Sequence, residues 1–124
     1  MLAMNKPWHK YNAKPITVDG IYYPSTMEYN FSVDFAKRFG YALQPHPPVV
    51  VLAQKGKTKI SWKLDYFDPT TGYYYDVKGK ETAVFKEKVK FWKLFGKAPL
   101  IKVTQAPGLP FPWIMTKIDP EPDI

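Results

Sequence analysis

Apolar residues in the first half of the chain recur at the spacing of a helix. Between 26 and 39 they fall at Met27, Phe31 and Phe35, so they line one side of a helix with 3.6 residues per turn. Gly40 follows this segment, and glycine is the residue that most often ends a helix. The pattern predicts an amphipathic helix over residues 26–39.

A second helix is predicted over residues 82–95, where apolar side chains begin at Phe85 and line one side. Lysines at spacings of four and three residues lie on the other side, at Lys86, Lys90 and Lys93. They form either an ordinary solvated helix face or a surface that contacts phosphate groups.

The remaining segments are rich in β-branched and aromatic residues and are bounded by turn residues, which is typical of strands. The order is a hairpin, a helix, three strands, a helix and a strand. This alternation predicts a mixed α/β fold with a central mixed β-sheet flanked by two helices. The predicted strand segments are 16–23 (a hairpin around Asp19-Gly20), 49–53, 59–67, 73–78 and 99–104.

The chain of 124 residues is most simply one domain with short additions. Residues 1–14 form a basic N-terminal arm, and residues 15–105 form the core domain. Residues 45–48, Pro-His-Pro-Pro, are a rigid connector within the core. Residues 106–124 are rich in proline and are expected to form an extended C-terminal tail that packs on the core.

Charge and composition narrow the classes of function. Lysine and arginine number 18 against 11 acidic residues, a formal charge of +7, which favours a polyanionic partner and nucleic acid first. Cysteine is absent, which excludes disulfides and thiol nucleophiles and fits a cytoplasmic protein. No run of about 18 apolar residues occurs, so no membrane span is expected.

The candidate chemistry lies on either side of one predicted turn at residues 68–72. If the hairpin is centred between 70 and 71, Asp65 lies across from Asp76. Strand side chains alternate, so Asp76 and Lys78 share one face of the sheet. Opposed carboxylates repel, and a divalent cation between them would remove that cost. The Val77 carbonyl, which faces the same place, is a further candidate ligand.

These residues, in this order, resemble the PD-(D/E)xK nuclease superfamily, and within it small phage-encoded endonucleases and phage Holliday-junction resolvases. The position before Asp65 is leucine rather than proline, and Asp76 stands where glutamate is commoner. The matching segments are Lys10-Tyr11-Asn12-Ala13-Lys14, Val18-Asp19-Gly20-Ile21, Ser25-Thr26-Met27-Glu28, Asp65-Tyr66-Phe67 and Asp76-Val77-Lys78-Gly79.

The resemblance implies a restriction-endonuclease-like core and a Mg²⁺-dependent DNA endonuclease, with Mn²⁺ able to substitute. It implies that Glu28 joins Asp65 and Asp76 at the metal, and that Lys78 assists the attack of water. Branched DNA as substrate, a homodimer, and the cytoplasm of a phage-infected or prophage-bearing bacterium follow from the same resemblance.

Two alternatives stay open from the sequence. Glu28 stands three residues after Ser25, and this spacing also fits a capping box that needs no catalysis. The basic residues, including Lys10 and Lys14 of the arm, also fit a non-catalytic nucleic-acid-binding module. Such a module would bind DNA equally well without the carboxylates and would never cut it.

Overall fold

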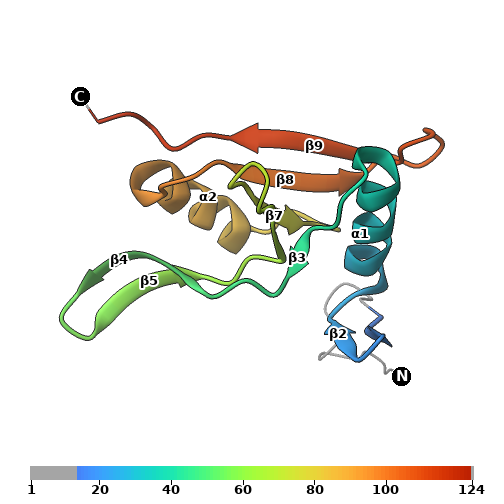
Figure 1. Cartoon of the computed structure of the whole chain (residues 1–124). Coiled ribbons are helices and arrows are strands. Elements are labelled where there is room, and N and C mark those ends of the chain that lie inside the picture. Colours follow the sequence, from blue (N-terminus) through green and yellow to red (C-terminus); the bar gives the residue numbers. More distant parts are fainter. Residues whose placement is uncertain (1–13, 124) are drawn as a thin grey trace, which may run out of the picture.

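The computed structural model describes residues 14–123 and has a mixed α/β fold with two helices (Figure 1). Among these residues no helix is both long and apolar enough to cross a membrane. In chain order the elements are β1 (Ile16–Val18), β2 (Ile21–Tyr23), α1 (Thr26–Phe39), β3 (Gln44–Pro45), β4 (Val50–Lys55), β5 (Thr58–Trp62), β6 (Tyr66–Phe67), β7 (Tyr74–Val77), α2 (Ala83–Phe95), β8 (Leu100–Gln105) and β9 (Trp113–Ile118).

The central sheet has five strands in the order β3-β6-β7-β8-β9. Strands β7 and β8 are parallel and are joined through α2, whereas the other neighbouring pairs are antiparallel. The predicted mixed sheet with two helices is therefore confirmed. Strands β1 and β2 form one separate hairpin, and β4 and β5 form another.

Both predicted helices are present. Helix α1 has the predicted bounds, with Ser25 as its N-cap, and Gly40 follows it in the left-handed conformation at φ 83°. Helix α2 begins one residue later than predicted because Thr82 is its N-cap and accepts a hydrogen bond from the Phe85 N–H.

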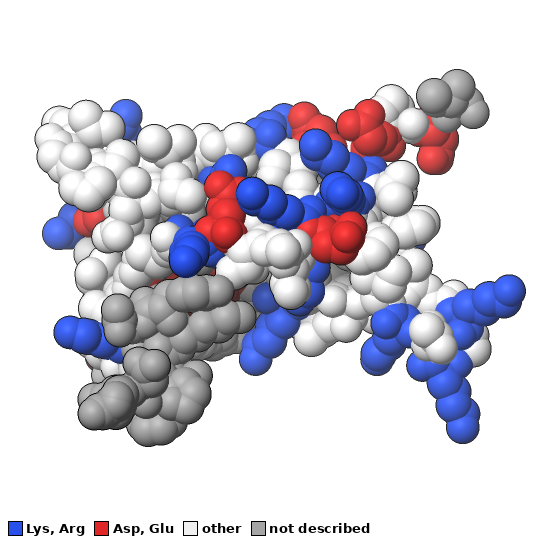
Figure 2. Space-filling view, turned by 180° about the vertical axis from the view of Figure 1, so that it is seen from behind, with Lys and Arg blue, Asp and Glu red and all other residues white. Residues whose placement is uncertain are grey.

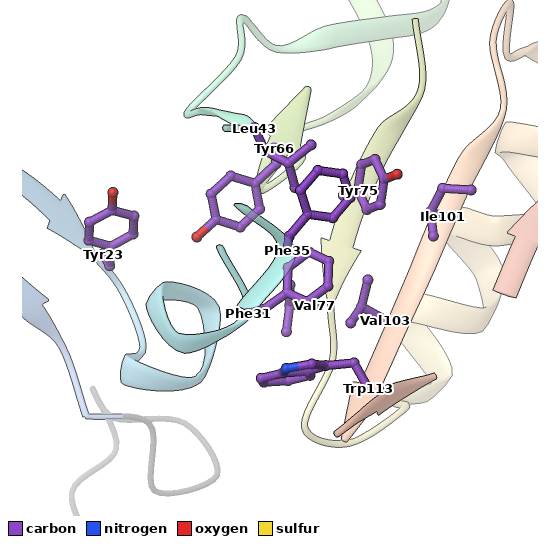
Figure 3. Packing of buried hydrophobic residues seen from close by; sticks show 10 residues of the cluster. All are labelled: Tyr23, Phe31, Phe35, Leu43, Tyr66, Tyr75, Val77, Ile101, Val103 and Trp113. Carbon is purple, nitrogen blue, oxygen red and sulfur yellow. The ribbon is translucent and has the colours of Figure 1, made fainter. Parts of the chain in front are cut away.

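One face of the sheet packs against α1 (Figure 3). The Phe31 ring lies 6.0 Å from the Tyr75 ring and 5.4 Å from the Trp113 ring, measured between centroids. Val77 of β7 belongs to the same buried cluster. The apolar spacing that predicted α1 therefore fixes this helix over the strand that carries the candidate site.

The other face of the sheet packs against α2. Trp62 of β5 contacts Phe85 and Trp92 of α2, with each pair of ring centroids 5.8 Å apart. Leu64 and Leu100 complete the same buried cluster. Since Asp76 and Lys78 alternate with Val77 along the chain, their side chains lie on this α2 side of the sheet.

The turn between β6 and β7 is held by the buried carboxylate of Asp68. Its Oδ1 accepts a hydrogen bond of 2.9 Å from the Thr70 N–H, and its Oδ2 accepts one of 2.6 Å from the Tyr41 hydroxyl. These bonds fix the hairpin in the register that pairs Tyr66 with Tyr75. That is the register expected for a hairpin centred between 70 and 71.

The prediction of a single strand over residues 59–67 was wrong. It is divided into β5 and β6, which belong to different sheets. Leu64, between them, is buried in the α2-side cluster, and the Asp65 carbonyl accepts a hydrogen bond from the His46 N–H. Burial of Leu64 and this bond bend the chain where a continuous strand was expected.

Two segments have more regular structure than their prolines indicated. The predicted connector at 45–48 begins with Pro45, which ends β3 and pairs with Tyr66. The predicted tail at 106–124 contributes the edge strand β9, which is free of proline. Its first residue, Trp113, is buried and donates a hydrogen bond of 2.7 Å to the Asp34 carboxylate.

Candidate functional site

The candidate site lies where β6 and β7 begin to separate. The Asp65 N–H donates to the Tyr75 carbonyl at 3.1 Å, just beyond the last strand pair, Tyr66 with Tyr75. The Asp65 carboxylate then accepts a hydrogen bond of 2.7 Å from the Val77 N–H. The side chain of Asp65 therefore occupies the place where the next residue of a longer β6 would pair with β7.

Asp76 and Lys78 form an ion pair on the α2 side of β7. The Lys78 Nζ lies 3.3 Å from Asp76 Oδ2 and 5.1 Å from the centroid of the Phe85 ring. The Asp76 side chain is 4% exposed, whereas the Lys78 side chain is 31% exposed. The carboxylate is thus enclosed, and the ammonium group is still reached by solvent.

Glu28 reaches the same place from the first turn of α1. Its N–H donates to the Ser25 Oγ at 3.1 Å, and its carboxylate accepts from that hydroxyl at 3.3 Å. Its carbonyl accepts a hydrogen bond of 2.7 Å from the Tyr66 hydroxyl. Only half of the capping box is therefore formed: Ser25 caps the helix, but the Glu28 carboxylate contacts the Ser25 hydroxyl and not its N–H. The charge of Glu28 also acts on Asp65, so the metal role stays open.

The electrostatics show that the three carboxylates interact. Burial raises the pKa of Asp65 well above its usual value, and the charges of Asp76 and Glu28 raise it further. Burial also raises the pKa of Glu28. For Asp76, burial raises the pKa while the Lys78 charge lowers it. The site carries more negative charge than one lysine balances.

The donor set fits a divalent metal of the Mg²⁺ kind. Asp76 Oδ2 is buried and has no hydrogen-bond partner among the described residues, although the Lys78 ammonium lies nearby as an ion pair. Within residues 14–123 no three acidic or histidine side chains already converge on one point. Mg²⁺ does not require that, because it binds through one or two carboxylates and keeps waters or takes phosphate oxygens.

Lys88 of α2 acts electrostatically on the site and was not among the predicted site residues. Its charge lowers the pKa of Asp76, and its Nζ lies 5.7 Å from the centroid of the Trp62 ring. Lys88 follows Phe85 by three residues, so both lie on the side of α2 that faces the sheet. The spacing of Lys88 from Phe85 was the signal in the sequence that could have identified it. The lysines at spacings of four and three lie on the other face of the helix.

Of the other predicted nucleic-acid contacts, those within residues 14–123 form no ion pair with the three carboxylates. Lys86, Lys90 and Lys93 are exposed on α2, which leaves them available to a large ligand. Lys14 is exposed, and its carbonyl accepts hydrogen bonds from the N–H and the hydroxyl of Thr26 at the start of α1. Lys10 lies outside the described residues.

The crowded carboxylates predict an unusual dependence of stability on pH in the metal-free protein. The pKa of Asp65 is raised on folding, so protonation of Asp65 stabilises the folded protein. This stabilisation is complete below the ordinary carboxyl pKa of about 4, and it is lost as the pH rises through the folded-state pKa. We expect the melting temperature in EDTA to rise as the pH is lowered from 8 to 5.5.

Differential scanning fluorimetry of the wild type and Asp65→Asn measures this effect. Asparagine has no proton to lose, so the variant should show a smaller rise over the same pH range. Because all other ionisable residues are common to both proteins, the difference between the two curves reports Asp65. Parallel curves would show that the pKa of Asp65 is not raised on folding.

Comparisons of the chain with protein-family models, with curated proteins and with solved structures each found no match.

Proposed function

We propose that the protein is a Mg²⁺-dependent DNA endonuclease that hydrolyses backbone phosphodiesters. The observation that carries the proposal is the buried Asp76 carboxylate paired with the partly exposed Lys78 ammonium, next to Asp65, whose carboxylate accepts a hydrogen bond from the Val77 N–H of the same segment. The charges of Asp76 and Glu28 both raise the pKa of Asp65. Enclosed carboxylates with raised pKa values beside a partly exposed lysine are typical of functional sites.

The fold supports the proposal by its order of elements. The chain passes from the acidic residue of α1 to the carboxylate before β6. It continues through Asp76 and Val77 of β7 and the following Lys78 to α2 and the parallel strand β8. This is the order expected for the proposed restriction-endonuclease-like core. This order is also the one on which the resemblance to PD-(D/E)xK nucleases rests.

Asp65 and Asp76 would hold the metal, with Glu28 binding directly or through water. The Val77 N–H points to the Asp65 side of β7, and in an extended strand the carbonyl of the same residue points to that side too. The Val77 carbonyl is therefore suited to join the carboxylates. A bound divalent ion would polarise the phosphodiester and lower the pKa of an attacking water.

The lysines supply the remaining charge. The Lys78 ammonium is fixed by Asp76 and is partly exposed, so it can orient water and stabilise negative charge that develops on the phosphate. The charge of Lys88 acts on the same carboxylate, and Lys88 is suited to contact a neighbouring phosphate. Exposed lysines of α2 would position the DNA backbone without reading its sequence.

A cleavage assay tests the proposal. End-labelled linear duplex, single-stranded DNA and a four-way junction are incubated with the purified protein in Mg²⁺, Mn²⁺ or EDTA. We expect products in Mg²⁺ and Mn²⁺ and none in EDTA, with branched DNA cut in preference. A homodimer would cut two opposed strands of the junction. Binding without any product would instead identify a non-catalytic nucleic-acid-binding module.

A further inference from the structure

Strands β4 and β5 form a ribbon that projects from the body of the protein (Figure 1). Within residues 14–123 they pair only with each other, and their far end is a turn at Gly56, which has φ 60°. The near end is anchored, because Trp62 packs against Phe85 and Trp92 of α2. The ribbon therefore leaves the body in a fixed direction, and its tip is free of the core.

The ribbon is strongly basic. Residues 49–64 contain four lysines and no aspartate or glutamate. Lys55, Lys57 and Lys59 are exposed around the tip, and Figure 2 shows basic side chains gathered at this projecting end with no acidic side chain among them. Concentrated positive charge without internal partners is complementary to a polyanion.

The register distributes this charge over both faces of the ribbon. Lys55 pairs with Thr58, and Gln54 pairs with Lys59. Paired residues share a face and neighbouring residues alternate, so Lys55 and Lys59 lie on opposite faces. Lys57 lies between them in the turn. A ribbon lying flat on one DNA strand would contact phosphates with only one face. A ribbon in a groove, between the two phosphate backbones, would contact phosphates with both faces.

We propose that the β4–β5 ribbon enters the major groove of a duplex next to the cleavage site, with Lys55 and Lys59 contacting phosphates of opposite strands and Lys57 contacting a third phosphate from the turn. The major groove is about 12 Å wide and admits a two-stranded ribbon. The inference deepens the proposed nuclease function and rests on its DNA substrate. It assigns a second contact surface, separate from the lysines of α2.

The covalent link to the site gives the ribbon a defined reach. Asp65 follows Lys57 by eight residues along the chain. At about 3.3 Å per residue the tip lies at most about 26 Å from the carboxylates, which corresponds to roughly eight base pairs. The ribbon would therefore hold the duplex within one helical turn of the phosphate that is cut.

Salt-dependent binding to a fluorescent duplex in EDTA tests the inference. Replacing Lys55, Lys57 and Lys59 with glutamine should flatten the slope of log affinity against log salt by about 0.9 per lost contact, or about 2.7 in all. Between 50 and 200 mM salt, the wild type should then lose roughly 40-fold more affinity than the variant. An unchanged slope in a folded variant would overturn the proposal.

A matched control removes three exposed positive charges elsewhere, with Lys37, Arg38 and Lys117 replaced by glutamine. These residues lie on α1 and β9, and the control should keep the wild-type slope. An equal flattening in the control would show that total charge, and not the ribbon, sets binding.

Two measurements separate groove insertion from surface contact. The single variants Lys55→Gln and Lys59→Gln should each flatten the slope, whereas an effect of only one would place the ribbon flat on the backbone. Methyl green, which occupies the major groove, should compete with binding, and netropsin, which occupies the minor groove, should not. The reverse result would overturn the choice of groove.

These tests are independent of cleavage. If the protein binds DNA through the ribbon but never cuts it, the role of the ribbon is supported and the proposed nuclease function is wrong. Metal-dependent cleavage with an unchanged salt slope in the ribbon variant would do the opposite.

Discussion

Asp65→Asn is expected to abolish DNA cleavage while the protein still folds and binds DNA. Asparagine keeps an oxygen that can accept the hydrogen bond from the Val77 N–H, so the local backbone has no reason to move. It removes a negative charge that a divalent ion needs. Loss of metal-based catalysis is worth several kcal/mol, so we expect at least roughly a 10³-fold fall in the single-turnover rate.

Asp19→Asn is the matched control for this variant. Asp19 is exposed in the β1–β2 turn with φ 52°, a conformation that asparagine tolerates well. The control removes one carboxylate of the same size and should cut DNA at the wild-type rate. If folded Asp65→Asn also cuts at the wild-type rate, Asp65 is not a metal ligand and the proposed site is wrong.

Lys78→Gln is expected to have the second largest effect, on the rate of bound substrate rather than on affinity. Its ammonium is fixed 3.3 Å from Asp76 Oδ2 and is the cation placed to meet charge on the phosphate. Loss of one such stabilising group typically lowers a rate by about 10²- to 10³-fold. Single-turnover cleavage with saturating protein measures that rate, and anisotropy measures the dissociation constant.

Lys37→Gln serves as the control, because Lys37 is exposed in the last turn of α1, away from the carboxylates. It should leave both quantities unchanged. A thermal melt of Lys78→Gln must accompany the assay, since its loss removes the ion-pair partner of a buried carboxylate. A folded Lys78→Gln protein that bound DNA more weakly but cut bound DNA at the normal rate would limit Lys78 to binding.

The elements that the sequence predicted well are those governed by local patterns. Helix α1 has the predicted bounds because Ser25 and Gly40 are strong end signals around a regular apolar spacing. The β6–β7 register followed from the short turn that Asp68 holds. Because that register relates Asp65 to Asp76, the main pair of the candidate site could be derived from spacing alone.

The features that the sequence did not predict depend on contacts between distant segments. The division of β5 from β6 follows burial of Leu64 against α2, which no local pattern reveals. Strand β9 is stabilised by pairing with β8 and by burial of Trp113, despite the prolines around it. The effect of Lys88 on the site depends on which side of α2 faces the sheet, and the sequence alone did not show this.

Everything proposed for the chemistry depends on a divalent ion at Glu28, Asp65 and Asp76, and paramagnetic NMR locates such an ion directly. Substoichiometric Mn²⁺ is added to ¹⁵N-labelled protein, and the amide signals that broaden first are mapped on the sequence. We expect broadening centred on these residues and Val77, reversed by excess Mg²⁺ and lost in Asp65→Asn. Broadening centred elsewhere, for example at the exposed acidic residues Asp119, Glu121 and Asp123, and unchanged in Asp65→Asn, would contradict the metal site.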